Sequence, residues 1–289
     1  MYTITGITGQ VGGAVARNLL AAKLPVRAVV RDSGKGAAWA ERGCEIALAE
    51  IGDAAALTNA FKGSDGVFIL LPSNFDPSPG FPEVRSIVAT VKSALEAACP
   101  AKVVCLSTIG AQATRTNLLT QLTIMEEVLG GLSMPVTFLR PAWFMENSAW
   151  DVAPARENGV ISSFLQPLDK PVPMVATADI GRTAAALLQE TWDGRRIVEL
   201  EGPRRVTPNE IVTVFSGLLA RPVRAEIVPR ETWESLFLSQ GMKNPAPRIG
   251  MLDGFNEGWI EFENGEAGSR KGTTGLETVL EALINRKDH

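Results

Sequence analysis

Tyrosine and histidine, two side chains that commonly move protons in enzyme active sites, are almost absent from this chain of 289 residues. The one tyrosine, Tyr2, lies in the predicted first strand, and the one histidine is residue 289. This scarcity excludes a histidine-based zinc site and a Ser-His-Asp hydrolase, and we expect no metal site. It also argues against carbonyl reduction by a Tyr-x-x-x-Lys pair, in which the phenol protonates the carbonyl oxygen. We assign no catalytic residue from the sequence.

An excess of positive charge and long hydrophobic runs are lacking as well. The formal net charge is −4, so the chain has no basic surface of the kind that drives nucleic-acid binding. No apolar run approaches the roughly 20 residues that cross a bilayer. The first strand begins at residue 2, which leaves no room for a signal peptide before it. We therefore expect a cytoplasmic protein with small-molecule partners and neither nucleic acid nor membrane; its oligomeric state is not predicted.

Cysteine is scarce too. Cys44, Cys99 and Cys105 are an odd number of residues without the spacing of metal ligands. We expect buried free thiols in a reducing cytoplasm, and the sequence assigns them no role.

A glycine-rich turn is the most informative feature that is present. Gly6-Ile7-Thr8-Gly9-Gln10-Val11-Gly12 lies between a β-prone run, residues 1–5, and a helix with Val11, Val15 and Leu19 at four-residue spacing. In a dinucleotide-binding turn the first glycine allows the tight reversal, the second leaves the backbone bare for a pyrophosphate, and the third lets the helix pack closely. The helix N-terminus then presents free N–H groups to that pyrophosphate. The alternative is an ordinary βα turn without a ligand.

The first half of the chain alternates between short Val/Ile/Leu-rich runs and helical patterns. This alternation predicts a parallel sheet buried on both faces. We expect strands at 26–30, 44–48, 66–71, 102–106 and 135–139, and helices at 36–42, 54–61, 82–98 and 118–129.

The pattern loosens after Arg140-Pro141. We expect a helix at 177–189 capped by Thr177 or Asp179, and one at 208–219 with Thr207 as its N-cap in a capping box. Two more helices are expected at 230–239 and 276–286. The predicted fold is α/β: a Rossmann-type doubly wound parallel sheet over residues 1–147, to which part of 176–205 returns, with a smaller α+β substrate or cap domain at 148–289.

The end of the second strand distinguishes NADP from NAD in such folds. Here the strand ends in Val30-Arg31, and Lys35 follows. A guanidinium can fork onto the oxygens of a 2′-phosphate, so NADP(H) is preferred. Asp32 would favour the ribose hydroxyl of NAD(H) if the register differed by one residue, and NAD(H) stays possible.

Five short segments, in a fixed order along the chain, together resemble a known protein family. They are residues 6–12, Val30-Arg31-Asp32-Ser33-Gly34-Lys35, Gly52-Asp53 with Leu57, Leu106-Ser107-Thr108-Ile109-Gly110-Ala111, and residues 139–147. Over residues 1–205 the chain resembles the NmrA-like family of atypical short-chain dehydrogenases/reductases, which includes NADPH-dependent quinone and triphenylmethane-dye reductases.

The resemblance implies a set of contact residues. The cofactor-binding residues it implies are Gly6, Thr8, Gly9, Gln10, Val11 and Gly12 at the pyrophosphate, Arg31 and Lys35 at the adenosine phosphate, Gly52, Asp53, Leu71 and Pro72 near the adenine or ribose, and Ser107 and Thr108 at the ribose. Trp143, Phe144 and Asn147 would lie near the nicotinamide or substrate. The chain departs from its relatives at Leu118 and Leu122, where polar relay residues are common, and this argues against a protein proton donor.

Aromatic residues after the sixth strand suggest the acceptor. Trp143, Phe144, Trp150, Phe164 and Met174 could form a flat apolar wall, although each alone is more typical of a core between two domains. The function we expect is NADPH-dependent hydride transfer to a planar electrophile such as a quinone or dye, with the proton taken from water. The alternative is a non-catalytic NADP(H)-binding sensor, and a sugar-nucleotide epimerase is a distant third.

Overall fold

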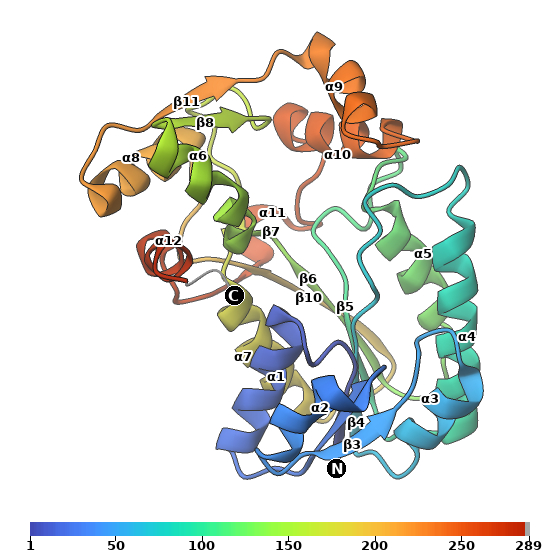
Figure 1. Cartoon of the computed structure of the whole chain (residues 1–289). Coiled ribbons are helices and arrows are strands. Elements are labelled where there is room, and N and C mark those ends of the chain that lie inside the picture. The colour runs from blue at the N-terminus through green and yellow to red at the C-terminus, as the bar shows by residue number, and fades with distance from the viewer. Residues whose placement is uncertain (287–289) are drawn as a thin grey trace.

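A computed structural model describes residues 1–286 (Figure 1). Its centre is an eight-stranded sheet in the order β12-β10-β6-β5-β4-β1-β2-β3, in which every neighbouring pair is parallel. The strands of this sheet are β1 (Tyr2–Ile4), β2 (Val26–Val30), β3 (Glu45–Leu48), β4 (Gly66–Ile69), β5 (Val103–Leu106), β6 (Val136–Pro141), β10 (Arg195–Glu201) and β12 (Arg270–Lys271). The order reverses between β1 and β4, which confirms the doubly wound Rossmann-type fold.

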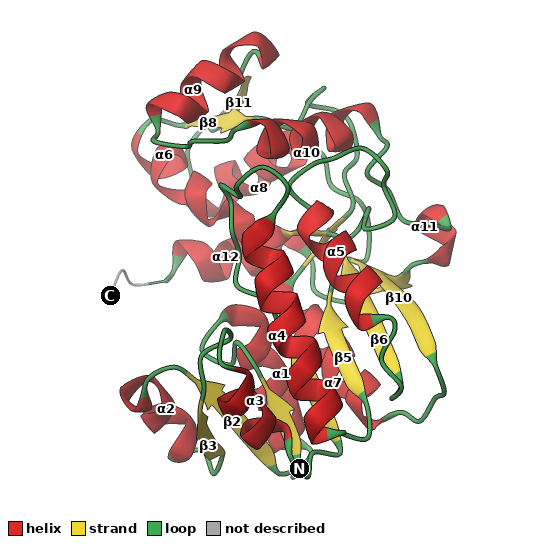
Figure 2. Cartoon of the chain, turned by 90° about the vertical axis from the view of Figure 1, so that its right-hand side faces the viewer, coloured by secondary structure: helices red, strands yellow, loops and turns green. Residues whose placement is uncertain are grey.

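Helices cover both faces of the sheet (Figure 2). One face carries α1 (Gln10–Ala21) and α7 (Thr177–Gln189), which pack against each other. The other carries α3 (Ala54–Phe61), α4 (Pro82–Ala98) and α5 (Thr120–Leu129), while α2 (Ser33–Ala40) lies beside β2 and β3. Burial on both faces explains why these strands read as continuous apolar runs.

The contact between α1 and α7 depends on small residues. A Cβ built on Gly181 would lie only 2.3 Å from the Cβ of Ala14. The two helix backbones therefore approach more closely than larger side chains would allow. This contact fixes α1, and with it the glycine turn that precedes the helix.

The remaining elements gather beyond the carboxyl ends of the strands (Figure 1). They begin with β7 (Trp143–Phe144), the 3₁₀ helix η1 (Met145–Asp151), α6 (Val152–Glu157), β8 (Val160–Ser163) and β9 (Met174–Val175). They continue with α8 (Pro208–Leu219), β11 (Arg224–Ile227), η2 (Arg230–Thr232), α9 (Trp233–Ser239), α10 (Ala246–Glu257), α11 (Gly265–Gly268) and α12 (Leu276–Ile284). Two small parallel pairs, β8 with β11 and β7 with β9, join these segments. The division at residue 147 into two domains stays a prediction.

Several local predictions are confirmed and several are wrong. Helices 54–61, 82–98, 177–189 and 208–219 have the predicted bounds, and Thr207 and Glu210 form the predicted capping box. Neither Thr177 nor Asp179 caps α7, however, because the fully buried Asp179 instead accepts hydrogen bonds from the backbone N–H groups of Thr273 and Thr274.

Other predictions shift or fail. The helix expected from 118 begins at Thr120, after a turn in which Asn117 accepts from the Leu119 N–H at 2.7 Å. Cys99 is exposed rather than buried, since it lies at the left-handed C-cap of α4. Strand β10 and helix α10 were not predicted. Within residues 1–286, no helix is long and apolar enough to cross a membrane.

Candidate functional site

Parallel strands bring the predicted cofactor residues to one edge of the sheet. The glycine turn follows β1, Arg31 follows β2, and Leu71-Pro72 and Ser107-Thr108 follow β4 and β5. Since β1 and β4 flank the reversal of strand order, this edge is where doubly wound folds bind ligands. The sequence placed these segments correctly relative to the strands.

The glycine turn has the geometry that a pyrophosphate requires. Gly6 has a φ of +63°, and a Cβ on Gly12 would lie 2.3 Å from the Gly6 carbonyl oxygen, so both positions need glycine. A Cβ on Gly9 would meet only that same oxygen, at 3.3 Å, with open space elsewhere. Helix α1 has neither a side-chain cap nor an acidic residue in its first turn. Its N-terminal N–H groups are therefore available to an anion, and the turn fits a dinucleotide pyrophosphate.

The acidic and basic residues after β2 and β3, where the adenosine is predicted to lie, have different surroundings. Asp32 is the N-cap of α2, and its Oδ1 accepts from the Gly34 N–H at 2.7 Å. Asp53 similarly caps α3 by accepting from the Ala56 N–H at 3.0 Å. Both carboxylates thus have a structural use, whereas the side chains of Arg31 and Lys35 are exposed at the end of β2 and in α2. Arg31 and Lys35, rather than Asp32, stay the predicted contacts of an adenosine phosphate.

Ser107 belongs to a buried polar network. Its hydroxyl donates to Glu126 Oε1 at 2.5 Å, and Glu126 also accepts from Arg140 Nε and Nη2 at 2.8 and 2.7 Å. Burial alone would lower the pKa of Arg140, but the hydrogen bond to Glu126 and the charges of Glu126, Glu263 and Glu199 raise it. Because the single hydroxyl proton of Ser107 is used in this way, its side chain can only accept from a ribose. Thr108 is half-buried and Pro72 exposed.

The predicted aromatic wall is assembled only in part. Trp143 and Phe144 are half-buried just after β6, and the Trp143 ring meets Phe255 edge-on at 5.1 Å. Asn147 is exposed on η1 and Trp150 is 86% exposed three residues later, on the same side of that 3₁₀ helix. Met174 is only 2% exposed, so its place in the wall is wrong: it lies in β9, beside β7, and belongs to the buried core.

Phe164 packs against a buried cluster that contains Trp233 and Phe237, and Trp143 packs against the same cluster. The Phe164 ring centroid lies 5.7 Å from that of Trp233 and 5.4 Å from that of Phe237, both fully buried. The sequence did not assign Trp233 or Phe237 a role, since they follow one another at helical spacing in a segment that reads as ordinary core.

Glu146 joins η1 to the start of α7. Its carboxylate accepts from the Thr177 N–H at 2.9 Å and from the Thr177 hydroxyl at 2.6 Å. The Thr177 hydroxyl also lies 3.5 Å from Oε1 of Gln10 in the glycine turn. Burial raises the pKa of Glu146, while the hydrogen bonds from Thr177 oppose that shift. The carboxylate therefore holds the segment after β6 close to the turn.

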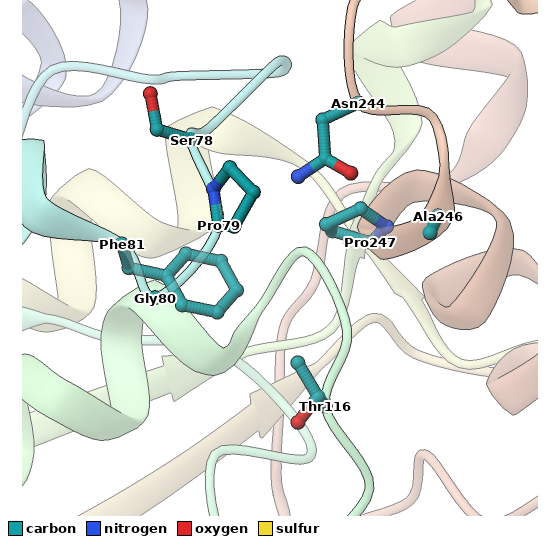
Figure 3. Close-up of a pocket in the computed structure, with 8 residues that line it drawn as sticks. All are labelled: Ser78, Pro79, Gly80, Phe81, Thr116, Asn244, Ala246 and Pro247. Atoms are coloured by element: carbon teal, nitrogen blue, oxygen red, sulfur yellow. The ribbon is translucent and has the colours of Figure 1, made fainter.

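Two hollows flank the segment after β5. The first, of about 330 Å³, lies between residues 78–81, which precede α4, and a segment around the start of α10 (Figure 3). Asn244, Ala246 and Pro247 line it from that segment, and Thr116 completes it. The second, of about 520 Å³, lies between α5 and β10 and is lined by charged residues that include Glu126, Arg140 and Arg195. The sequence analysis missed both, because each joins segments that are far apart in the chain.

The first hollow is held open by a loop-to-loop contact. Asp76 accepts from the backbone N–H groups of Lys243 and Asn244, at 2.8 and 2.7 Å, and these bonds lower its pKa. Asn244 in turn donates from Nδ2 to the Pro77 carbonyl at 2.8 Å. The loop after β4 and the segment before α10 are thereby tied together on the carboxyl-end side of the sheet.

Asp151, the last residue of η1, carries an unusual carboxyl. Burial raises its pKa to about 7, and a hydrogen bond with Ser148 only partly offsets the shift. An unfolded aspartate ionises near pH 3.9, so between about pH 4 and 7 the folded chain binds the additional proton. The free energy of unfolding should therefore fall as the pH rises through this range.

We expect Asp151→Asn to raise the free energy of unfolding at pH 8 by up to about 4 kcal/mol, because the substitution removes a carboxyl whose pKa folding raises to about 7. At pH 4 the substitution should have little effect. Urea denaturation at both pH values measures this. The exposed Asp193→Asn is the matched control. An equal effect of Asp151→Asn at pH 4 and pH 8 would show that its carboxyl does not titrate between them.

Comparison with known proteins defines the class. Residues 2–252 match the NmrA-like family, and the chain belongs to this family. It is 28% identical over 244 residues to quinone oxidoreductase 2 of Escherichia coli, covering 84% of this chain and 82% of the relative. It is 26% identical over 243 residues to the NAD(P)H azoreductase of Xenophilus azovorans, with the same coverages.

The fold is shared with solved structures of this class. The crystal structure of the NADPH-dependent quinone oxidoreductase of Escherichia coli complexed with NADPH matches with a TM-score of 0.80. The match is 24% identical and covers 99% of this chain and all of that chain. The expected resemblance to the NmrA-like family is thus confirmed.

Proposed function

We propose that this protein is an NADPH-dependent oxidoreductase that transfers a hydride to a planar electrophilic acceptor such as a quinone or dye. The observation that carries the proposal is the uncapped start of α1 behind Gly9 at the same sheet edge as the exposed Arg31 and the half-buried Trp143. The curated relatives named above, a quinone oxidoreductase and an azoreductase, support the same reaction class.

The bound nicotinamide would supply the hydride, and the residues of this chain would bind and orient the reactants. The backbone after Gly9 binds the pyrophosphate, and Arg31 with Lys35 binds the adenosine phosphate. Gly52, Asp53, Leu71, Pro72 and Thr108 are proposed to lie along the adenine and ribose. Trp143, Phe144, Asn147 and Trp150 are proposed to contact the nicotinamide or the acceptor.

The acceptor needs proximity and an apolar surface rather than a proton donor. Leu118 is buried and Leu122 is packed against the core, so neither predicted relay position offers a polar group. The first hollow, at about 330 Å³, is within the size range of small-molecule sites and has a mainly apolar lining with Asn244 as a polar contact. We place the acceptor between this hollow and Trp143. A cytoplasmic location and the absence of nucleic-acid partners stay predictions from the sequence.

The same observations favour a second candidate, an NADP(H)-binding sensor. The Ser107 hydroxyl donates to Glu126, and leucines occupy the two expected relay positions, 118 and 122. A panel assay separates the two candidates: purified protein is mixed with NADPH and neutral quinones, azo dyes and triphenylmethane dyes, and absorbance at the nicotinamide band is followed. Oxidation that depends on protein and acceptor supports the enzyme. Tight NADPH binding with no oxidation by any acceptor would support the sensor.

Arg31→Ala tests the choice of cofactor. The variant should weaken NADPH binding by roughly 10- to 150-fold, because a hydrogen bond to a charged group contributes about 1.5–3 kcal/mol, and should weaken NADH binding much less. Calorimetric titration of both cofactors measures the two losses. Arg42→Ala, which removes an exposed guanidinium stacked on Trp39, is the control. Equal losses for NADPH and NADH would contradict the role of Arg31.

A further inference from the structure

Arg248, in the first turn of α10, is a half-buried arginine without a polar partner. Within residues 1–286 it has neither a hydrogen bond nor an ion pair, and burial is the one influence on its pKa, which it lowers. Arg140 and Arg205 are also largely buried, but the hydrogen bonds and charges of carboxylates outweigh burial and raise the pKa of both. Because the side chain is only half-buried, solvent still reaches its N–H donors, and no carboxylate of residues 1–286 pairs with the charge.

The guanidinium of Arg248 lies over an aromatic ring. Its central carbon is 4.4 Å from the centroid of Phe237, and Phe237 in turn packs against Phe164 with 5.4 Å between ring centroids. A cation over an aromatic face is attractive, yet the ring leaves the N–H donors of the guanidinium without acceptors. The site thus combines an aromatic surface with unused charged donors.

The position of Arg248 along α10 relates it to the candidate site. Arg248, Met251 and Phe255 stand at i, i+3 and i+7, which places them on one stripe of the helix. Phe255 contacts the Trp143 ring edge-on at 5.1 Å. Seven residues of helix span about 10 Å, so Arg248 lies about that far along the axis from the Trp143 contact. Ala246 and Pro247, in the same turn as Arg248, line the first hollow, whereas Arg248 itself lies over Phe237 outside that lining.

We propose that Arg248 binds an anionic substituent, a sulfonate or carboxylate, on a planar aromatic acceptor. This inference rests on the proposed function, because the aromatic part of the ligand is the acceptor placed between Trp143 and the first hollow. A guanidinium presents paired donors that match the oxygens of such groups, and the anion completes the pairing that the protein leaves open. The spacing of about 10 Å suits a two-ring aromatic system with the acidic group at one end.

Calorimetric binding to the protein saturated with NADP⁺ tests the proposal without any turnover. The probes are 2-naphthalenesulfonate and its neutral counterpart 2-naphthol. Wild-type protein should bind the sulfonate more tightly. Arg248→Met, which removes the charge and keeps the length of the side chain, should reduce the preference for sulfonate over naphthol by roughly tenfold or more. Arg248→Lys, which keeps the charge but not the fork of donors, should retain part of the preference.

Arg230→Met is the matched control. Arg230 also lies over an aromatic ring, that of Trp233 at 5.0 Å, but Asp253 already pairs with it at 2.6 Å. Its loss should leave the preference for sulfonate unchanged. If Arg248→Met weakens the binding of both probes equally, Arg248 only packs on Phe237. A wild-type protein that binds no sulfonate at millimolar concentration would also overturn the proposal.

The outcome is distinguishable from failure of the proposed function. Reduction of neutral quinones in the acceptor panel tests hydride transfer and does not depend on an anionic group. If the protein binds the sulfonate through Arg248 but oxidises no NADPH, the anion site is supported and the reductase function is contradicted. If the protein reduces quinones but Arg248→Met leaves the preference for sulfonate over naphthol unchanged, the reductase function is supported and the anion site is contradicted.

Discussion

Gly9→Val is expected to abolish binding of NADPH and NADH while leaving the fold intact. Gly9 has φ −87° and ψ 177°, an extended conformation that valine adopts readily. The added methyl groups would enter the open space in front of the α1 N-terminus, where the pyrophosphate is proposed to lie. Loss of two hydrogen bonds to a charged group corresponds to roughly a hundredfold or more in affinity.

The choice of Gly9 matters for this test. A side chain at Gly12 would collide with the Gly6 carbonyl and disturb the turn itself, so that variant would confuse folding with binding. Gly217→Val is the control, because a Cβ added at Gly217 would have no other atom within 4 Å. Circular dichroism and thermal melting establish the fold, and calorimetry measures binding. Wild-type affinity for NADPH in Gly9→Val would place the phosphates elsewhere.

Arg140→Met should have the largest effect on stability. The side chains of Arg140, Glu126 and Glu199 are 3–4% exposed. Removing the arginine takes away the ion-pair partner of Glu199 and leaves Glu126 with Arg195, which lies 3.7 Å away. Breaking a buried ion pair in this way costs about 3–5 kcal/mol. Urea denaturation gives the free energy of unfolding of each variant.

An exposed pair provides the comparison for Arg140. Arg115 pairs with Glu257 at 3.1 Å, and both side chains are more than half exposed at 66% and 58%. Arg115→Met should therefore cost less than about 1 kcal/mol. A loss of similar size for both variants would mean that the network around Arg140 is not the buried, coupled unit described above.

The predictability of the fold differs between elements for physical reasons. Strands β2, β4 and β5 are buried on both faces and short, so an apolar run was sufficient to place them. Strand β10 was missed because Arg195, Glu199 and Glu201 interrupt its apolar pattern. Their charges are tolerated since Glu199 lies 3.7 Å from Arg140 and Glu201 pairs with Lys271 at 2.6 Å. Such pairing joins residues that are distant in sequence and cannot be read from a local window.

The candidate site likewise has parts that the local sequence predicts and parts that depend on tertiary contacts. The glycine turn and Arg31 are local to single βα units, and their geometry follows from spacing alone. Helix α10 was not predicted because Gly250, Asp253 and Gly254 break its apolar periodicity. The first hollow requires the start of α10 to lie against a segment about 165 residues earlier, and only the tertiary structure brings the two together.

A single-turnover experiment tests whether a hydride passes directly from NADPH to a quinone on this protein. A single turnover of excess protein with 1,4-naphthoquinone is followed with NADPH and with NADPH that is dideuterated at the transferred position. We expect one NADPH oxidised for each quinone reduced, a slower reaction with the deuterated cofactor when chemistry limits the rate, and no reaction with Gly9→Val. NADPH that binds to the wild-type protein but is oxidised no faster than without protein would contradict hydride transfer to the quinone.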